Sequence, residues 1–287
     1  MIAVYKKEMR AYFTNMMGYI FLAFMLLLMG IWFVLISVFG MTGNFQNVLS
    51  NTTIFFFVLI PILTMRLFSE EARQKTDQLL FTSPLSVVKI VMGKFFAATT
   101  LFIIGVVITL IFVLMINNYG DLPWSRIWGA YIGFVLLGVS MIAVGVFISV
   151  LTDNQIVAAI ATVGAIFLMF IIDSVALSMP ITTSASFIFV GLVIAVVAII
   201  WYNSIKNVLA AIIVAVLGLA VAGGLYLYNN LIYDAIIVRV MLWFSVYARF
   251  NSFAMGLLTV QDIVYYVSFA ILFVYLTINV LEKRRWR

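Results

Sequence analysis

The sequence predicts an all-α polytopic membrane protein with about eight transmembrane helices. The chain has 287 residues, of which 66% are hydrophobic and only 9% are charged, whereas soluble domains are roughly 25% charged. It contains repeated apolar runs of about 20 residues, enough to cross a hydrocarbon core roughly 30 Å thick. The predicted spans are residues 18–40, 52–67, 95–117, 127–151, 155–178, 184–202, 206–228 and 261–281.

The segment before the first span, residues 1–16, is amphipathic. Ile2, Tyr5 and Met9 share one face at helical spacing, and the neighbouring basic residues lie largely elsewhere. An apolar face opposite a basic face is typical of a helix that lies flat in the headgroup layer of a bilayer. We therefore expect an interfacial helix at this end of the chain.

A polar segment from Thr64 to Lys94, here called the bracket, separates the second span from the third. It holds three of the ten acidic residues and five of the sixteen basic residues. These residues are Glu70, Glu71, Asp77, Arg66, Arg73, Lys75, Lys89 and Lys94. We interpret the bracket as a helical element on the cytoplasmic face that a soluble partner can bind. The alternative is a solvated loop that merely joins two spans.

The chemistry of the bracket predicts a helix from Glu70 to Leu80. Ser69 is a favourable N-cap residue, because its hydroxyl can accept a hydrogen bond from a backbone N–H of the first turn. Glu70 and Glu71 then lie in that turn, where carboxylates favour the positive end of the helix dipole. Pro84 cannot donate a backbone hydrogen bond, so we expect the helix to end before it.

The distribution of basic residues predicts that both termini are cytoplasmic. In this orientation thirteen Lys and Arg residues lie on the inner side, against only Arg126, Arg239 and Arg249 on the outer side. Residues 229–259 then lie on the outer face, where we expect short helices that enter the outer leaflet and return. An even number of spans is required, and six is the alternative to eight if 184–228 forms a re-entrant hairpin.

Small residues recur at four-residue spacing in the fourth and fifth spans, which lets helices approach closely in lipid. The pairs are Gly129 and Gly133, Gly145 and Ser149, and Ala161 and Ala165. They indicate either a dimer or moving interface, or packing within the chain.

Asp173 is the charged residue that falls well inside an apolar run. An aspartate at the bilayer centre costs about 2.5–3.5 kcal/mol on insertion scales, and less near the interface. Asp173 therefore either faces a substrate path or lies at the outer boundary within reach of water.

The composition excludes several chemistries. The chain has no Cys and no His, which excludes disulfides, Cys/His metal sites, a Cys nucleophile and a His general base. The Walker A pattern is absent, because Gly93 and Lys94 are followed by Phe95 and lack the earlier glycine. Any ATP hydrolysis therefore requires a separate chain. The net charge of +6 is explained by membrane topology rather than by nucleic-acid binding.

Residues 61–86, PILTMRLFSEEARQKTDQLLFTSPLS, resemble the coupling segment of type-2 ABC exporter permeases. The likeness is greatest to the gliding-motility and nitrous-oxide-accessory permeases. The matching positions are Thr64, Arg66, Glu70, Glu71, Thr76, Leu79, Leu80 and Pro84. Gln78 departs from the pattern, because it stands where that group has an acid. Residues 256–266 and 283–286 resemble the same group, as does the amphipathic N-terminus.

The resemblance implies a single transmembrane permease domain over residues 1–287. In that domain, 1–16 is the elbow helix, 66–94 is the cytoplasmic coupling region, and 229–259 is the outer-face re-entrant segment. The family usually has six spans, so the additional pair is 184–228. Coupling to the ATPase is implied for Arg66, Glu70, Glu71, Arg73, Thr76, Asp77, Leu79, Leu80 and Pro84.

The resemblance also implies the partners of the chain. They are two copies of an ABC ATPase subunit, which would hold ATP and Mg, and a second permease copy or a homologous permease. The assembly would lie in the lipid of the cell (inner or plasma) membrane. We expect no cofactor in this chain and no nucleic-acid partner.

We therefore expect the membrane-spanning permease subunit of an ABC exporter, not itself an enzyme, with Asp173 as the candidate residue for a substrate path. One alternative is a membrane-embedded lipid-modifying enzyme or scaffold. Such an enzyme needs polar catalytic residues clustered near one membrane face, and the sequence shows no such cluster. The other alternative is an ion-coupled secondary transporter, which usually carries several intramembrane charges.

We predict that the loop between the third and fourth spans is extracytoplasmic. Because the chain has no native Cys, a Gly120→Cys variant can be tested with a membrane-impermeant maleimide. The charge asymmetry predicts labelling in intact cells. Labelling only in inside-out vesicles would contradict the predicted topology.

Overall fold

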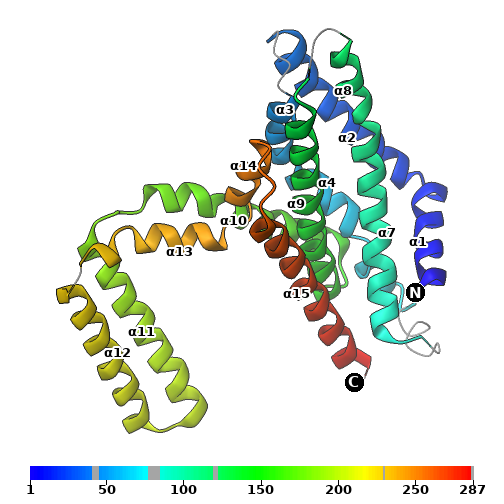
Figure 1. The fold of residues 1–287 in the computed structure, drawn as a ribbon. Coiled ribbons are helices and arrows are strands. Elements are labelled where there is room, and N and C mark those ends of the chain that lie inside the picture. Colours follow the sequence, from blue (N-terminus) through cyan, green and yellow to red (C-terminus); the bar gives the residue numbers. More distant parts are fainter. Residues whose placement is uncertain (41–44, 77–84, 119–121, 229, 286–287) are drawn as a thin grey trace. The chain divides into compact units, whose positions relative to one another are not determined.

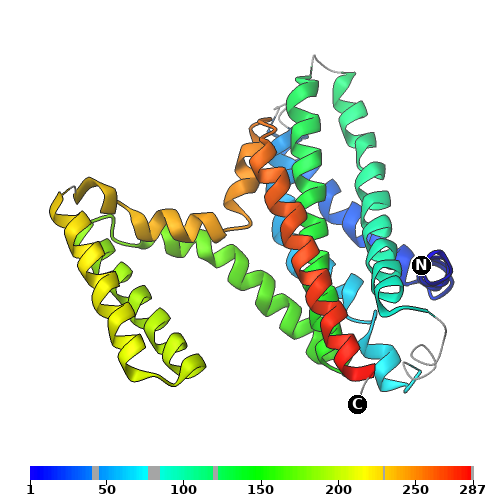
Figure 2. The same cartoon turned by 60° about the horizontal axis from the view of Figure 1, so that its bottom comes forward.

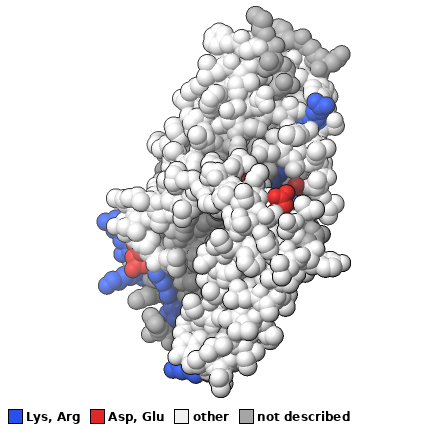
Figure 3. Space-filling model, turned by 90° about the vertical axis from the view of Figure 1, so that its left-hand side faces the viewer, with Lys and Arg blue, Asp and Glu red and all other residues white. Residues whose placement is uncertain are grey.

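The computed structural model describes residues 1–40, 45–76, 85–118, 122–228 and 230–285. All regular structure in these residues is helical (Figure 1). Seven helices are long and apolar enough to cross a membrane, and the number is eight if one bent helix pair counts as a single span. The predicted class, an all-α polytopic membrane protein with about eight spans, is confirmed. Figure 3 shows a face on which uncharged side chains predominate, as expected for a protein surrounded by lipid.

The second candidate span starts at Phe45 rather than residue 52, and the third starts at Val87 rather than residue 95. The other helices follow the predicted spans more closely, and α10 (Gln155–Ser178) has the predicted bounds. The others before it are α1 (Ile2–Thr14), α2 (Met17–Phe33) with η1 (Val34–Val38), α3 (Phe45–Thr52), η2 (Thr53–Phe55), α4 (Phe56–Thr64), α5 (Ser69–Arg73), α7 (Val87–Ile108), α8 (Leu110–Asn117) and α9 (Trp124–Leu151). Those after it are α11 (Thr183–Ile205), α12 (Val208–Tyr228), η3 (Asn230–Tyr233), α13 (Ile236–Phe244), α14 (Ala248–Ala254) and α15 (Val260–Arg285).

The chain forms two compact units. Unit 1 comprises Met1–Met169 and Val246–Arg287, and unit 2 comprises Phe170–Ser245. That residues 1–287 act as a single permease domain stays a prediction.

Unit 1 is built around α9, which packs against α4, α7, α14 and α15. Figure 2 shows α15 running beside α9. Phe134 of α9 is fully buried and contacts Phe56 and Phe102, with ring centroids 4.9 and 5.9 Å apart, respectively. A helix that is apolar on all sides is expected at the centre of a bundle, and α9 is the most buried of the candidate spans.

The small residues of α9 serve packing within the chain. A Cβ atom on Gly133 would lie 2.3 Å from Phe253 Cβ, and one on Gly129 would lie 3.1 Å from Gly256 Cα. A Cβ atom on Gly145 would lie 2.3 Å from Thr64 Oγ1. The interpretation as intrachain packing is therefore confirmed for these three glycines.

Unit 2 is a helical hairpin of α11 and α12 that packs against η3, with α13 beside α11. The turn of the hairpin lies at Lys206, whose φ of 53° is left-handed. Phe187, Tyr226 and Tyr233 form an aromatic cluster, and the Tyr233 hydroxyl donates to the Ala222 carbonyl at 2.8 Å. Residues 230–254, within the predicted re-entrant segment, form the short helices η3, α13 and α14, as expected.

We predict that Gly133→Ala destabilises the protein by about 1–3 kcal/mol, because the added methyl group overlaps Phe253 in a packed interface. Gly164→Ala is the matched control, since a Cβ atom there meets nothing within 4 Å. The control is expected to keep or slightly raise stability. The measurement is the unfolding free energy in detergent micelles, and equal stabilities for the two variants would contradict the packing described.

Candidate functional site

Contrary to the prediction from the sequence, Ser69 is not the N-cap of the bracket helix. Phe68 occupies the N-cap position, and Ser69 is the first residue of α5. The Ser69 hydroxyl instead donates to the Met65 carbonyl one turn earlier. Serine hydroxyls commonly bond the carbonyl four residues back, and here that bond replaces the predicted N-cap.

The helix predicted from Glu70 to Leu80 is wrong at residues 74–76, and its remaining part lies outside the described residues. The helix α5 ends at Arg73, and Lys75 has a left-handed φ of 57°, which interrupts a right-handed helix. Thr76 is half-buried, and its hydroxyl donates to the Glu71 carbonyl at 3.3 Å. The other predicted coupling residues, Asp77, Leu79, Leu80 and Pro84, lie outside the described residues.

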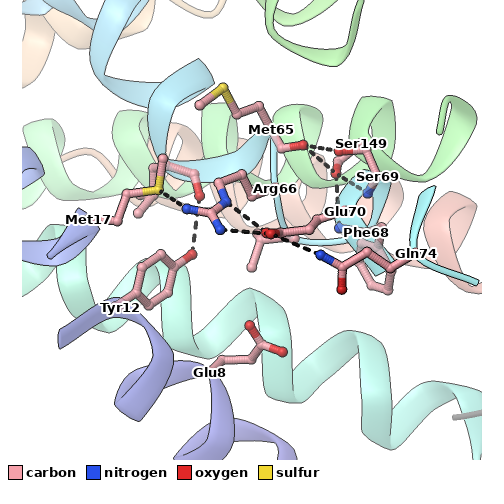
Figure 4. Close-up of polar contacts among 12 residues, drawn as sticks. Glu8, Tyr12, Met17, Met65, Arg66, Phe68, Ser69, Glu70, Gln74 and Ser149 are labelled. Atoms are coloured by element: carbon pink, nitrogen blue, oxygen red, sulfur yellow. Dashed lines mark hydrogen bonds and ion pairs between the residues drawn. The ribbon is translucent and has the colours of Figure 1, made fainter. Parts of the chain in front are cut away.

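The bracket is anchored on α9 by a serine. Ser149 Oγ accepts hydrogen bonds from the backbone N–H groups of Phe68 and Ser69, at 3.1 and 3.3 Å (Figure 4). These N–H groups precede or begin a helix and have no partner within it. One turn earlier on α9, Gly145 makes room for the Thr64 side chain. The small residues of α9 thus hold the start of the bracket against the bundle.

A buried lysine joins the bracket to two other helices. Lys94 of α7 is 1% exposed, and its ammonium group lies 3.0 Å from Glu8 of α1 and 2.9 Å from Glu71 of α5. It also donates to the Leu67 carbonyl. A lysine ammonium has three N–H donors, and these contacts use all three. We call Lys94, Glu8, Glu71 and Lys7 the lysine node.

Lys7 completes the lysine node at its outer side. Its ammonium donates to Glu71 Oε1 at 2.9 Å, so both oxygens of that carboxylate have a cationic partner. Partial burial lowers the pKa of Lys7, but the Glu71 carboxylate outweighs this effect and raises it above the ordinary value. Lys7 therefore stays cationic, and two carboxylates are held by two ammonium groups.

The lysine node requires α1 and α7 to lie close together, and Gly93 allows this. A Cβ atom on Gly93 would lie 2.9 Å from Val4 Cβ and 3.1 Å from the Met1 carbonyl oxygen. Glycine therefore lets α1 pack directly on α7. Gly93 and Lys94 are not part of a Walker A motif. Gly93 allows the close contact between α1 and α7, and Lys94 forms the ion pair with Glu8.

A second ion pair stabilises the bracket internally. The Arg66 guanidinium donates to both carboxylate oxygens of Glu70, at 2.7 and 2.8 Å, and to Met17 Sδ at 3.0 Å (Figure 4). Tyr12 of α1 donates to the Leu63 carbonyl at 3.1 Å, and burial raises the pKa of its phenol. A cavity of about 60 Å³, with both polar and apolar lining residues, lies between α1 and the bracket.

The structure thus separates the predicted coupling residues into two groups. Arg66 and Glu70 pair with each other, whereas Glu71 pairs with Lys94 and Lys7. Arg73 and Lys75 are exposed. The predicted pairing of Glu70 and Glu71 with a partner ATPase stays a prediction.

Asp173, the residue predicted for a substrate path, lies in unit 2. Its carboxylate interacts with the Ser245 hydroxyl. Its role in a substrate path also stays a prediction. Among the described residues, no group of three or more acidic side chains is placed to hold a metal ion.

Sequence reasoning missed the lysine node. It treated Lys94 as one of the charges of the bracket and gave Glu8 no role. The available signal was that Lys94 continues an apolar helix, where an unpaired ammonium would be costly. Such a lysine implies a carboxylate partner, but no local pattern identifies Glu8, 86 residues away.

These features define a multi-pass helical membrane protein whose polar bracket is tied to its N-terminal helix and its spans. The family model described as "ABC-2 family transporter protein" matches residues 2–179. The chain belongs to this family, and it is therefore a membrane permease of ABC transport. The match ends where α10 ends, so the α11–α12 hairpin lies beyond it. No curated protein and no solved structure matches the chain.

We predict that Lys94→Met lowers the free energy of unfolding by about 3–5 kcal/mol, because it leaves Glu8 and Glu71 facing each other without the central cation. Adding Glu71→Gln is expected to restore part of the loss. Lys89→Met, an exposed position on the same helix, is the control and should stay within about 0.5 kcal/mol of wild type. Equal effects at positions 94 and 89 would show that the lysine node is not structural.

Proposed function

We propose that the chain is the permease subunit of an ABC exporter that couples to a separate ATPase through the bracket. ABC-2 permeases normally work with an ATPase subunit, and this chain has no Walker A pattern. The lysine node is the observation that carries the proposal, because it connects the bracket to a membrane-spanning helix and to α1. In this proposal α1 is the elbow helix, and both termini and the bracket lie in the cytoplasm.

The ATPase would contact the exposed turn of the bracket. Arg73, Gln74 and Lys75 are exposed there, whereas Glu71 faces inward to Lys94. This turn presents two cations, which favours an acidic surface on the ATPase. The predicted residues Asp77, Leu79 and Leu80 follow directly in the sequence and would extend the same contact.

Movement of the ATPases on binding ATP would then reach the spans through two rigid connections. The first is the lysine node, which holds the bracket to α7 and α1. The second is the anchor on α9, made by Ser149 and the close contact at Gly145. ATP and Mg would be held by the partner ATPases, and two permeases would form the translocation path between them. Among ABC-2 permeases, we assign the chain to the gliding-motility and nitrous-oxide-accessory group on the sequence of the bracket.

We predict that an Arg73→Glu/Lys75→Glu double variant weakens copurification of the ATPase about tenfold or more, because like charges across an interface oppose association. Its unfolding free energy should stay close to that of wild type, since both side chains are exposed. Arg126→Glu, at an exposed position on the predicted outer side, is the control for charge reversal. Unchanged ATPase binding and unchanged substrate-stimulated hydrolysis in the double variant would contradict coupling through this turn.

Changing Glu70 and Glu71 is a less selective test. The sequence predicts that a Glu70→Ala/Glu71→Ala variant weakens ATPase association. The structure adds a loss of stability, because Glu71 is a partner of Lys94 and Glu70 is the partner of Arg66. The two effects are separated by measuring unfolding in the absence of the ATPase.

A further inference from the structure

A deep apolar groove opens between α7, α9 and α15 of unit 1. Its volume is about 460 Å³. Apart from Tyr266 and Tyr275, every lining side chain is hydrocarbon or thioether, with Met92 and Phe96 at one wall and Val267 and Ile278 at the other. All three helices are candidate membrane spans, so the medium outside the groove is lipid rather than water.

The dimensions of the groove fit one acyl chain. Its lining residues extend along α15 from Tyr266 to Ile278, about 18 Å at 1.5 Å per residue. One leaflet of a hydrocarbon core is about 15 Å thick. The groove therefore follows the length over which an acyl chain lies.

A second apolar cavity of about 280 Å³ lies between α1 and α7 and shares Phe96 with the groove. Ile2 and Tyr5 of α1 line it, together with Gly93 and Thr100 of α7. Phe96 thus separates two neighbouring apolar spaces. This arrangement suits a lipid with two acyl chains, one on each side of the Phe96 ring.

Cations lie where a headgroup would be. Lys89 is exposed one turn before Met92 on α7, and Arg285 is exposed two turns after Ile278 on α15. The two helices run in opposite directions, so both steps lead to the same end of the bundle (Figure 1). Lys6 follows Ile2 by one turn on α1, and it is exposed too. Glu282 lies on the same face of α15, and Lys283 is exposed beside it.

We propose that this groove binds an anionic phospholipid, with one acyl chain on each side of Phe96 and the phosphate between Lys89 and Arg285. Basic residues beside grooves between transmembrane helices favour anionic headgroups. The site does not include the exposed turn at Arg73 and Lys75, and it does not depend on coupling to an ATPase.

The test is titration of the purified chain with phosphatidylglycerol or phosphatidylcholine in detergent, followed by native mass spectrometry. With about 1 kcal/mol for each basic residue near the headgroup, the wild type should bind phosphatidylglycerol about 25-fold more tightly than phosphatidylcholine. Lys89→Gln/Arg285→Gln should reduce this ratio to near one. Lys75→Gln/Arg126→Gln removes two exposed cations elsewhere and should leave the ratio unchanged.

A steric variant tests the groove itself. Val267 is 45% exposed and lines the groove, so Val267→Phe enlarges a side chain there without entering the core. It should weaken binding of both lipids at least tenfold. An unchanged lipid ratio in Lys89→Gln/Arg285→Gln would overturn the proposal. So would a change of oligomeric state in Val267→Phe with unchanged lipid binding, because a second copy of the chain would then occupy the groove.

Discussion

The buried ammonium of Lys94 is the constraint on which the bracket and its connections depend. A charge that is 1% exposed is tolerated only when its hydrogen-bond donors are satisfied, and Lys94 finds its acceptors on three different segments. Glu8, Glu71 and the Leu67 carbonyl must therefore be in place together. The bracket is polar, and its helix α5 has only five residues. It is held in one position because the Lys94 ammonium requires all three partners at once.

The hydrocarbon environment explains the remaining architecture. Backbone groups must be satisfied within each spanning segment, which restricts the spans to helices. Association of these helices then relies on close packing rather than on the hydrophobic effect. In unit 1 this packing is achieved by Gly129, Gly133 and Gly145 on α9, each of which admits a specific neighbour. The same helix that organises the core also anchors the bracket through Ser149, so core packing and the bracket are parts of one arrangement.

The apolar runs predicted the fold well, because length and hydrophobicity alone decide whether a segment can span. Local signals were less reliable in the bracket. Serine is a favourable N-cap residue, but the Ser69 hydroxyl donates to the Met65 carbonyl instead. The left-handed backbone of Lys75 interrupts the helix that was expected to continue to Leu80. The lysine node could not be predicted from sequence, because the pairing of Lys94 with Glu8 depends on how α1 folds back over Gly93.

The central claim is that α1, the bracket and α7 move as one body. Double electron–electron resonance can measure it, because the chain has no native Cys and spin labels can be placed at exposed Arg10→Cys and at half-buried Ala72→Cys, which lies outside the turn proposed to contact the ATPase. In the complex with the proposed ATPase, the expected result is the same narrow distance distribution without nucleotide and with ATP bound. A second pair, Ala72→Cys with Lys283→Cys on α15, bypasses the lysine node and is predicted to shift. A shift in the first pair as large as that in the second would contradict the claim.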